Sequence, residues 1–384
     1  MPHFDIIRIA RPAETFRVKS VMGTYDLQTN KTTEHFVGDI NLPAEWNIGL
    51  IVGRSGTGKT TIARELFGDC IVDAYEYTHE SILDDMPKDA TVTEITQALS
   101  SVGFASPPSW LKSYSMLSNG EKMRCDLARA MLEKRDVFCF DEFTSVVDRT
   151  VAKVGAFAIQ KAIRKNGRKF IAVTCHADVE AWLMPDWVFN TDTMQFSVKD
   201  LAEQKKNRPA IRLDIVRLEN GTRENKIRAW AAFRKYHYLS DAFNIAATAF
   251  LVYAEGQLAA FTSYLPFPHP VKKNAKRLHR TVVFPDYQGI GIAKALTEVV
   301  CRSLHNEGKS VITTTSNPAR IATLKKSPDW KCTYIGRLSA ECMGIEGLKK
   351  TMSGRNRITA SFEYFPKIER ENYRLDGENP LKRK

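Results

Sequence analysis

The sequence predicts two consecutive domains, an α/β domain followed by an α+β domain. Each half contains a glycine-rich loop between an apolar strand and a helical segment, at residues 53–60 and at residues 286–293. A polar stretch with few apolar side chains, residues 199–209, separates the halves. With 384 residues the chain is long enough for two or three cores. We therefore expect domains at residues 1–200 and 209–366, a linker at 201–208 and a basic tail at 367–384.

The composition is that of a folded protein without a membrane or disulfide signal. Hydrophobic residues make up 43% and charged residues 26% of the chain, which is ordinary for a globular protein. The longest nearly uncharged apolar stretch, residues 245–254, is shorter than the roughly 20 residues that span a bilayer. The seven cysteines include no C-x-x-C pair, and the N-terminus has no continuous apolar segment of the signal-peptide kind. We expect a cytoplasmic protein with no membrane partner.

The net charge of +12 is unevenly distributed along the chain. Residues 1–200 hold 23 Lys and Arg against 27 Asp and Glu, whereas residues 201–384 hold 33 against 17. A basic second half predicts a polyanionic partner, DNA or RNA. The alternatives are lysines that only keep the surface soluble or that attract an anionic cofactor. The candidate phosphate contacts are Lys272, Lys273, Lys276, Arg277 and Arg280.

Strands and helices alternate before the polar stretch. Short apolar runs at 48–52, 137–140 and 170–174 predict buried strands, and helical segments lie between them. This alternation favours a largely parallel sheet.

The second half has a different order of elements. A hairpin is predicted around the Glu255-Gly256 turn, with strands at 250–253 and 258–264. The other predicted strands are 211–218, 278–284, 311–315, 331–335 and 357–365, and the predicted helices are 223–238, 292–305 and 318–326.

The first loop has the complete pattern G-x-x-x-x-G-K-[ST] between its strand and its helix. Its glycines let backbone N–H groups surround a phosphate, and the helix N-terminus adds the positive end of its dipole. We expect Lys59 to reach the β- and γ-phosphates of ATP and Thr60 to ligate Mg²⁺. A purely structural glycine-rich turn is the alternative. The expected nucleotide-binding residues are Gly53, Ser55, Gly56, Gly58, Lys59, Thr60 and Thr61.

Two carboxylates follow the strand at 137–140. Asp141 is expected beside the metal ion. Glu142 is expected to polarise a water molecule for attack on the γ-phosphate.

The segment L-S-N-G-E-K-M-R at residues 117–124 resembles the signature motif of ABC ATPases. S-V-V-D at 145–148 resembles the D-loop of that family, and His176 resembles its switch histidine. The resemblance covers residues 17–195 and implies a P-loop ABC ATPase domain that forms a head-to-tail homodimer on binding ATP. It implies that Ser118 and Gly120 of one chain face the nucleotide held by the other, and that Tyr25 stacks on adenine.

The sequence departs from the ABC pattern at several positions. Asn119 replaces the first glycine of the signature, and no Q-loop glutamine is evident; Gln97, Asp84 or Asp85 are the candidates. The segment between the P-loop and the signature is short. Together with the absence of a membrane segment, this favours a mechanical or regulatory ATPase without transporter subunits.

The second loop, Q-x-x-G-x-A, resembles the pyrophosphate loop of GNAT acyltransferases. The resemblance covers residues 209–366 and implies acetyl-CoA, or another acyl-CoA, as cofactor. A Rossmann dinucleotide site is the alternative, but it would want a third glycine where Lys294 stands. The expected cofactor contacts are the backbone of Val282 and Val283 together with Gln288, Gly289, Ile290, Gly291, Ile292 and Ala293.

Two histidines are candidates for the general base of acyl transfer. His279 precedes the loop on its strand, and His237 follows Trp230 by seven residues on a predicted helix. A hydrogen-bonded structural histidine is the alternative for each. Leu324 replaces the tyrosine that often serves as general acid in the GNAT family, which makes a standard amine acetyltransferase mechanism doubtful.

The aromatic residues around His237, the sequence S-N-P at 316–318 and the basic surroundings resemble phage GNAT relatives of the Mom type, which modify DNA bases. The whole chain resembles ABC–GNAT fusion proteins of bacteria and their phages. The leading hypothesis is an ATP-dependent acyltransferase for a nucleic-acid base amine. One alternative is a GNAT enzyme for a protein lysine or a small amine with a regulatory ATPase, and another is an ATP-gated nucleic-acid-binding module with a degenerate transferase site.

Overall fold

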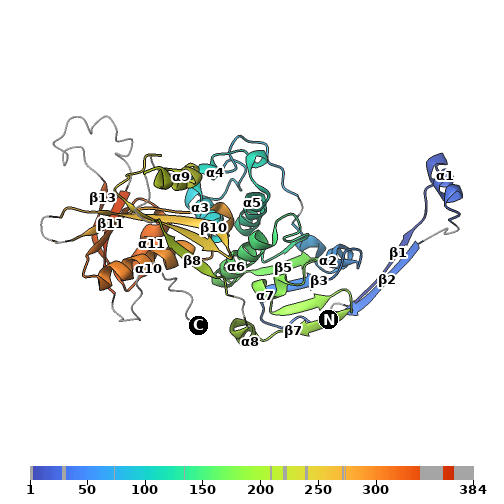
Figure 1. Cartoon of the computed structure of the whole chain (residues 1–384). Coiled ribbons are helices and arrows are strands. Elements are labelled where there is room, and N and C mark those ends of the chain that lie inside the picture. The colour runs from blue at the N-terminus through green and yellow to red at the C-terminus, as the bar shows by residue number, and fades with distance from the viewer. Residues whose placement is uncertain are drawn as a thin grey trace. The chain divides into compact units, whose positions relative to one another are not determined.

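The computed structural model describes residues 3–27, 32–72, 74–133, 135–207, 210–218, 223–237, 241–269, 272, 274–337 and 358–366 (Figure 1). The chain divides into two compact units. The first holds Met1–Glu76 and Arg129–Pro209, and the second holds Tyr77–Ala128 and Ala210–Lys384. Residues 77–128, expected in the ATPase domain, therefore group with the C-terminal part.

The first unit is built on a five-stranded sheet in the order β4-β5-β3-β6-β7. Strands β3 to β6 run parallel and β7 is antiparallel to β6. Every residue of β3 is buried, so this strand reads as a continuous apolar run. The predicted parallel sheet is confirmed. The strands are β3 (Ile48–Val52), β4 (Val137–Phe140), β5 (Lys169–Thr174), β6 (Trp187–Asn190) and β7 (Gln195–Val198).

The helices of the first unit connect these strands. They are α2 (Lys59–Phe67), the 3-10 turn η1 (Gly68–Cys70), α6 (Arg149–Asn166), α7 (Val179–Leu183) and α8 (Leu201–Lys206). Helix α8 lies where a linker was expected. Its side chains are polar but favour a helix, and the Asp200 carboxylate caps it by accepting from the Ala202 N–H at 2.7 Å.

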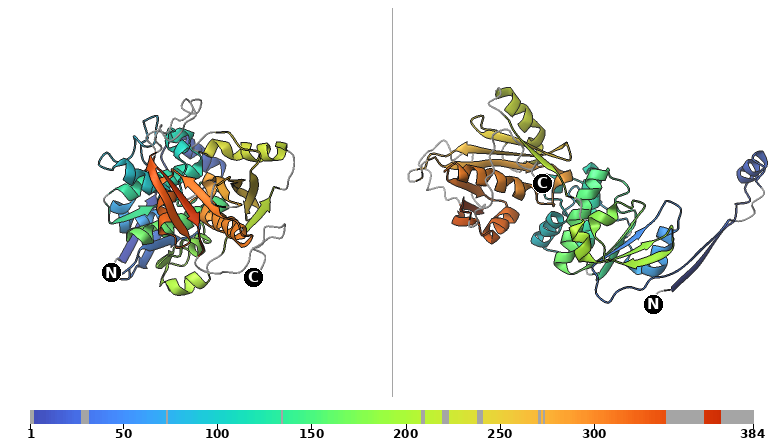
Figure 2. Two further views of the ribbon diagram at one scale, coloured as in Figure 1. Left: turned by 90° about the vertical axis from the view of Figure 1, so that its left-hand side faces the viewer. Right: turned by 60° about the horizontal axis from the view of Figure 1, so that its bottom comes forward.

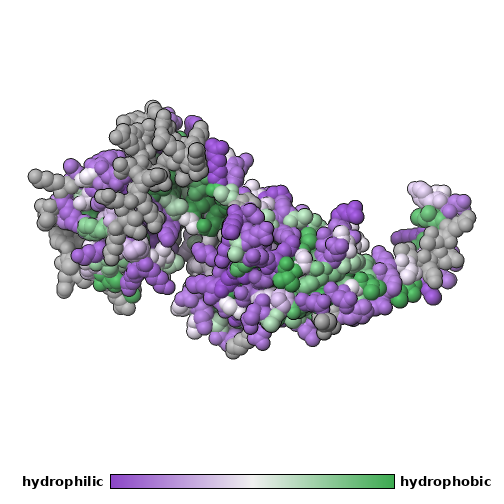
Figure 3. Space-filling model, turned by 90° about the horizontal axis from the view of Figure 1, so that it is seen from below, coloured by the Kyte–Doolittle hydropathy of each residue, from purple (hydrophilic) through white to green (hydrophobic). Residues whose placement is uncertain are grey.

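A hairpin arm, which the sequence analysis did not anticipate, forms a sheet of its own in the first unit. Strands β1 (His3–Ala10) and β2 (Thr32–Asp39) pair antiparallel over their whole length. Helix α1 (Phe16–Thr24) lies in the connection between the two strands, at the end of the arm away from the five-stranded sheet (Figure 1). Apolar side chains are exposed along the arm, among them Ile7, Ile9 and Phe16 (Figure 3).

The second unit contains a seven-stranded mixed sheet in the order β13-β14-β12-β11-β10-β9-β8. Only β11 and β12 are parallel, and they pair through two residue pairs, Lys276 with Val311 and Arg277 with Ile312. Within the described residues the two strands separate after that point. The strands are β8 (Leu213–Arg217), β9 (Thr248–Ala254), β10 (Gln257–Pro266), β11 (Lys276–Val283), β12 (Val311–Thr315), β13 (Trp330–Arg337) and β14 (Ile358–Tyr364).

Helices cover both faces of this sheet. Helix α9 (Arg223–Phe233) lies on one face, and α10 (Ile292–Asn306) and α11 (Pro318–Lys326) lie on the other (Figures 1 and 2). The order of elements agrees with the prediction. Residue 357 of the last predicted strand and the predicted tail at 367–384 lie outside the described residues. The remaining short helices here are the 3-10 turns η3 (Arg234–Tyr236) and η4 (Pro285–Tyr287).

Residues 77–128 supply the helical segment of the second unit. Its helices are α3 (Val92–Ser101), α4 (Pro107–Trp110), the 3-10 turn η2 (Tyr114–Met116) and the start of α5 (Asn119–Leu132). No helix in the described part of the chain has the length and apolarity needed to cross a bilayer.

Candidate nucleotide and acyl-CoA sites

Three adjacent parallel strands bring the expected ATPase residues to one edge of the first sheet. The register pairs Val52 of β3 with Thr174 of β5, and Phe140 of β4 with Ala172 of β5. The P-loop, the carboxylates at 141–142 and His176 directly follow the carboxyl ends of these strands. Ligands of open α/β sheets bind at this edge.

The P-loop has the backbone conformation that its glycines permit. Gly58 has φ of 82°, and a Cβ at this position would lie 2.6 Å from the Phe36 ring. Gly56 has φ of 87°, and a Cβ there would meet nothing within 4 Å. The Lys59 side chain is buried and donates from Nζ to the Arg54 carbonyl at 2.7 Å. The loop thus leaves open space at Gly56 beside a held ammonium group.

The turn between β6 and β7 supports the P-loop. Oγ1 of Thr191 lies 2.6 Å from Oγ1 of Thr57, and the Asp192 carboxylate accepts from Arg54 Nε at 3.1 Å and from its backbone N–H at 3.2 Å. Sequence reasoning missed both supporting residues. In the sequence, the only indication of these two residues is their position just after an apolar strand.

The carboxylate pair lies on a strained turn. Glu142 has φ of 54° and Thr144 has φ of 69°, which are uncommon values for residues other than glycine. Asp141 Oδ1 accepts from the Glu142 N–H at 2.9 Å, and the Phe143 N–H donates to the Val173 carbonyl at 2.8 Å. The turn is anchored to β5 and leaves the Glu142 side chain exposed.

His176 follows β5 and is half-buried. Its backbone N–H donates to Thr174 Oγ1 at 3.2 Å, and its buried Nδ1 has no hydrogen-bond partner among the described residues. Asp148, at the end of the D-loop-like segment, caps α6 by accepting from the N–H groups of Thr150 and Val151. The D-loop-like segment therefore starts this helix.

The signature segment forms the N-terminus of α5. Ser118 Oγ accepts from the Glu121 N–H at 3.3 Å, and Glu121 Oε2 accepts from the Ser118 N–H at 3.0 Å. This reciprocal pair is a capping box. Ser118 and Asn119 are exposed, whereas Gly120 is buried. The start of the helix is therefore accessible to a ligand, although Ser118 also has a structural role as its cap.

The candidate Q-loop residues lie in the helical segment of the second unit. Asp85 is buried and accepts from the Thr78 N–H at 3.0 Å and the His79 ring at 2.6 Å. Although burial acts in the opposite direction, these hydrogen bonds hold the pKa of Asp85 below its usual value. Gln97 is exposed on α3. Asp85 thus stabilises a local turn.

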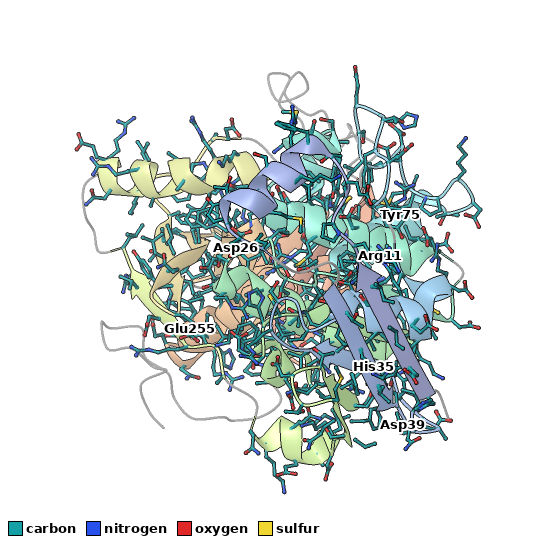
Figure 4. The ribbon with its side chains drawn as sticks, turned by 90° about the vertical axis from the view of Figure 1, so that its right-hand side faces the viewer. Arg11, Asp26, His35, Asp39, Tyr75 and Glu255 are labelled. Atoms are coloured by element: carbon teal, nitrogen blue, oxygen red, sulfur yellow. The ribbon has the colours of Figure 1, made fainter. Side chains whose placement is uncertain are left out.

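Tyr25 does not lie at the P-loop of its own chain. It caps the C-terminus of α1, in the connection between β1 and β2 at the tip of the hairpin arm, and is exposed. Figure 4 shows Arg11 and Asp26 at this end of the arm and Asp39 at the opposite end, where the chain leads on toward β3. Arg8, within β1, contacts Thr61 of α2, with 3.0 Å between Nη1 and Oγ1. Residues 11–27 extend the hairpin away from the P-loop (Figure 1), and the stacking of Tyr25 on adenine stays a prediction.

The second loop leads into α10, and the backbone N–H groups of residues 289–293 are not used for hydrogen bonds within the described residues. Gly289 and Gly291 have φ of 88° and 97°, and a Cβ at Gly291 would meet nothing within 4 Å. The first turn of this 15-residue helix has no acidic side chain. These features suit a bound diphosphate.

The backbones of Val282 and Val283 face opposite sides of β11. The Phe284 N–H donates to the Ala259 carbonyl at 2.9 Å, and the polar groups of successive residues alternate in direction. Val282 therefore pairs with Phe261 of β10, while Val283 faces the side where β12 has separated. Of the two expected pantetheine contacts, only Val283 has its backbone on the open side. Its carbonyl accepts from Gln288 Nε2 at 2.9 Å.

Both candidate histidines belong to one aromatic cluster. The ring centroids of His237 and Trp230 are 5.6 Å apart, and Trp230 stacks on Phe243 with 5.7 Å between centroids. The centroids of Phe243 and His279 are 5.5 Å apart. His279 Nδ1 is buried and has no hydrogen-bond partner among the described residues. Burial, followed by the charges of Arg280, Arg277 and His237, lowers the pKa of His279 to about 4. The adjacent residues 238–240 lie outside the described part of the chain.

The basic residues near the start of β11 have different surroundings. Lys272 forms an ion pair with the buried Glu363, so it is not a free phosphate contact. Arg280 lies over the Trp230 ring at 5.7 Å and donates to the Ala242 carbonyl at 3.0 Å. Arg277 lies over Phe267 at 5.0 Å. Lys273 lies outside the described residues.

Comparisons with known proteins agree with the two halves of the sequence. Residues 214–327 match the model of the Acetyltransferase (GNAT) family. The spermidine/putrescine import ATP-binding protein PotA of Borreliella afzelii is 26% identical over 206 residues, which cover 44% of this chain and 57% of that protein. The mRNA export factor elf1 of Schizosaccharomyces pombe is 34% identical over 140 residues, which cover 30% of this chain and 13% of that protein. The chain thus spans little more than half of the first relative and a small part of the second.

A solved dimeric structure of a bacterial ABC transporter cassette is also similar. It is 14% identical, the match covers 41% of this chain and 87% of that chain, and the TM-score is 0.33.

The chain thus joins a part that is similar to ABC-type ATP-binding proteins to a part, residues 214–327, that matches the GNAT family model. The predicted fold class, an α/β part followed by an α+β part, is confirmed.

Proposed function

We propose that this protein is an ATP-dependent, dimeric acyltransferase that modifies the exocyclic amine of a nucleic-acid base in the cytoplasm of a bacterial or phage-infected cell. The observation that carries the proposal is an aromatic cluster in which the buried Trp230 supports Phe243 and two half-buried histidines at its edge. Such a cluster suits a flat, stackable acceptor.

The ATPase half would hold ATP with Mg²⁺. The open space at Gly56 and the buried ammonium of Lys59 suit a phosphate chain. Thr60 and Asp141 offer the oxygen donors that Mg²⁺ prefers. Glu142 would orient the attacking water, and His176 would contact the γ-phosphate from the adjacent strand. Ser118 and Gly120 of a second copy would complete the site, which makes the homodimer the active form.

The GNAT half would hold the diphosphate of an acyl-CoA on the N–H groups of residues 289–293, with Val283 pairing along the pantetheine arm. The cofactor supplies the acyl group as a thioester. When the acyl group passes from the thioester to the acceptor nitrogen, CoA would leave as its thiolate, and His279 or His237 would take the proton that this nitrogen loses.

The chemistry of His279 favours a base amine over lysine. A lysine ammonium, with a pKa near 10.4, must lose a proton before it can attack. A histidine whose pKa is lowered to about 4 is a poor acceptor for that proton. The amine of a nucleobase is already uncharged and releases its proton only as the C–N bond forms. The excess of Lys and Arg in residues 201–384, 33 against 17 acidic residues, would attract the phosphate backbone.

The test is nucleoside mass spectrometry of DNA and RNA incubated with the protein, ATP, Mg²⁺ and acetyl-CoA. We expect a 42-dalton acetyl increment on one nucleoside, which is absent without ATP and absent when His279→Ala and His237→Ala are combined. Acetylated lysine without a modified nucleoside would support the protein-lysine alternative. Salt-sensitive nucleic-acid binding without CoA binding would support the degenerate module.

A further inference from the structure

Arg124 connects the signature helix with the acyl-CoA loop inside the second unit. It lies on α5, six residues after Ser118, and is almost fully buried, with 1% of its surface exposed. Its Nη1 donates to the Pro285 carbonyl at 2.9 Å and its Nη2 to the Asp286 carbonyl at 3.1 Å. The Asp286 carboxylate lies 4.0 Å from the same guanidinium. One side chain thus holds two successive carbonyls of the turn that starts the loop.

A second link reaches the same loop from the helical segment. The Ala105 N–H donates to Gln288 Oε1 at 2.7 Å. The other end of that amide, Nε2, donates to the Val283 carbonyl at 2.9 Å. Gln288 therefore joins residues 77–128 to the strand and the loop that are expected to hold the cofactor.

These contacts make the loop sensitive to the position of the signature. An arginine fork is planar and rigid, so two carbonyls bonded to it keep a fixed separation and direction. The 3-10 turn η4 leads through Gln288 into residues 289–293, whose N–H groups make no hydrogen bond within the described residues. Ser118 and Arg124 are about 9 Å apart along one helix at 1.5 Å per residue. A shift at Ser118 is thus transmitted to the turn by a rigid element.

We infer that Arg124 is a positioning residue that couples the two cofactor sites, so that ATP binding tightens the binding of acyl-CoA. ATP held by a second copy would engage Ser118 and hold the start of α5 in place, and Arg124 would then hold η4 in the conformation that presents the loop. The inference rests on the proposed ATP-dependent dimer.

The experiment measures acetyl-CoA affinity by calorimetry on the full-length Glu142→Gln protein, with and without saturating ATP and Mg²⁺. This background is chosen to prevent turnover. We expect ATP to tighten acetyl-CoA binding at least about fivefold, the lower end of ordinary coupling. Arg124→Met keeps an apolar side chain but has no hydrogen-bond donors. It should reduce the ratio of the acetyl-CoA affinities with and without ATP to about one. Arg124→Lys, which lacks the fork, should also reduce it.

Arg302→Met is the matched control. Arg302 is a buried arginine of the same unit, ion-paired with Glu298 at 2.6 Å on α10. Its replacement should leave the coupling intact. If Arg124→Met does not fold, reciprocity still tests the idea without any change at position 124. Acetyl-CoA must tighten ATP binding by the same factor, because coupling free energies are mutual.

Equal or weaker acetyl-CoA affinity in the presence of ATP would overturn the inference. If both ligands bind and the dimer forms, but ATP does not change the acetyl-CoA affinity, the proposed function stands and only the role assigned to Arg124 is refuted. If either ligand fails to bind the protein with Arg124 intact, the proposed function and the inference fall together.

Discussion

Lys59 donates a hydrogen bond from its ammonium group to the carbonyl of Arg54, 2.7 Å away within its own P-loop. The lysine is buried, and the Arg54 backbone is held in turn by Asp192. The charge therefore already lies inside the loop, where an incoming phosphate can take over the bond.

Lys59→Ala should weaken ATP binding at least tenfold, because hydrogen bonds to charged groups contribute about 1.5–3 kcal/mol. Calorimetry with ATP and Mg²⁺ measures the loss. The melting temperature without nucleotide serves as the folding control. ATP affinity equal to that of the wild type would contradict the assignment of this loop.

Glu142→Gln should keep ATP binding and lower turnover about 100-fold or more, since the amide has the shape of the carboxylate but cannot act as a base. Light scattering with ATP should then show twice the monomer mass. A monomer at saturating ATP would refute the head-to-tail dimer.

Gly291→Val should abolish acetyl-CoA binding by the full-length protein. Position 291 has φ of 97°, and a side chain there would occupy space now open at the start of α10. Gly256→Val is the matched control, because Gly256 also has a positive φ, 80°, with open space around it, but lies in the β9–β10 turn. Equal loss in both variants would indicate a folding defect instead of a blocked site.

Stability should depend on the protonation of His279. Its pKa in the folded protein is lowered from 6.5 to about 4, so the unfolded chain binds more protons between these values. The free energy of unfolding should therefore fall as the pH falls from 6.5 to about 4. His279→Phe should make this dependence shallower, as measured by urea unfolding over a pH series. An identical slope in both proteins would show that His279 is not held neutral by its surroundings.

Binding to duplex DNA should weaken with salt, at a slope of roughly −0.9 in log K per neutralised phosphate. Replacing Lys276 and Arg277 by Gln should flatten that slope by about two, whereas Lys325→Gln with Lys326→Gln on α11 should not. Lys272 is excluded from this test because its loss would leave Glu363 buried without its partner. No binding at low salt would remove the nucleic-acid hypothesis.

The sequence predicts local elements well because they depend on neighbouring residues. The P-loop, the second loop and most strands have the expected bounds, since turn glycines and apolar runs specify them directly. The contact of Arg124 with Pro285 was not predictable, because an arginine bonded to backbone carbonyls leaves no pattern in the acceptor residues. The hairpin arm was missed for a related reason. Its strands expose apolar side chains such as Ile7 and Val37, so they lack a clear alternation.

The separation of β11 and β12 has a further consequence for the sheet. Two residue pairs alone join them, so the seven strands behave as two smaller sheets that meet at one end. Beyond that meeting point, the Val283 backbone faces the side of β11 on which no pairing with β12 is found among the described residues. A guest that carries amide groups, as the pantetheine arm does, would complete the sheet there by strand addition. The bound cofactor would then act as part of the sheet, and the backbone of β11 would have all of its hydrogen-bond partners only when the cofactor is bound.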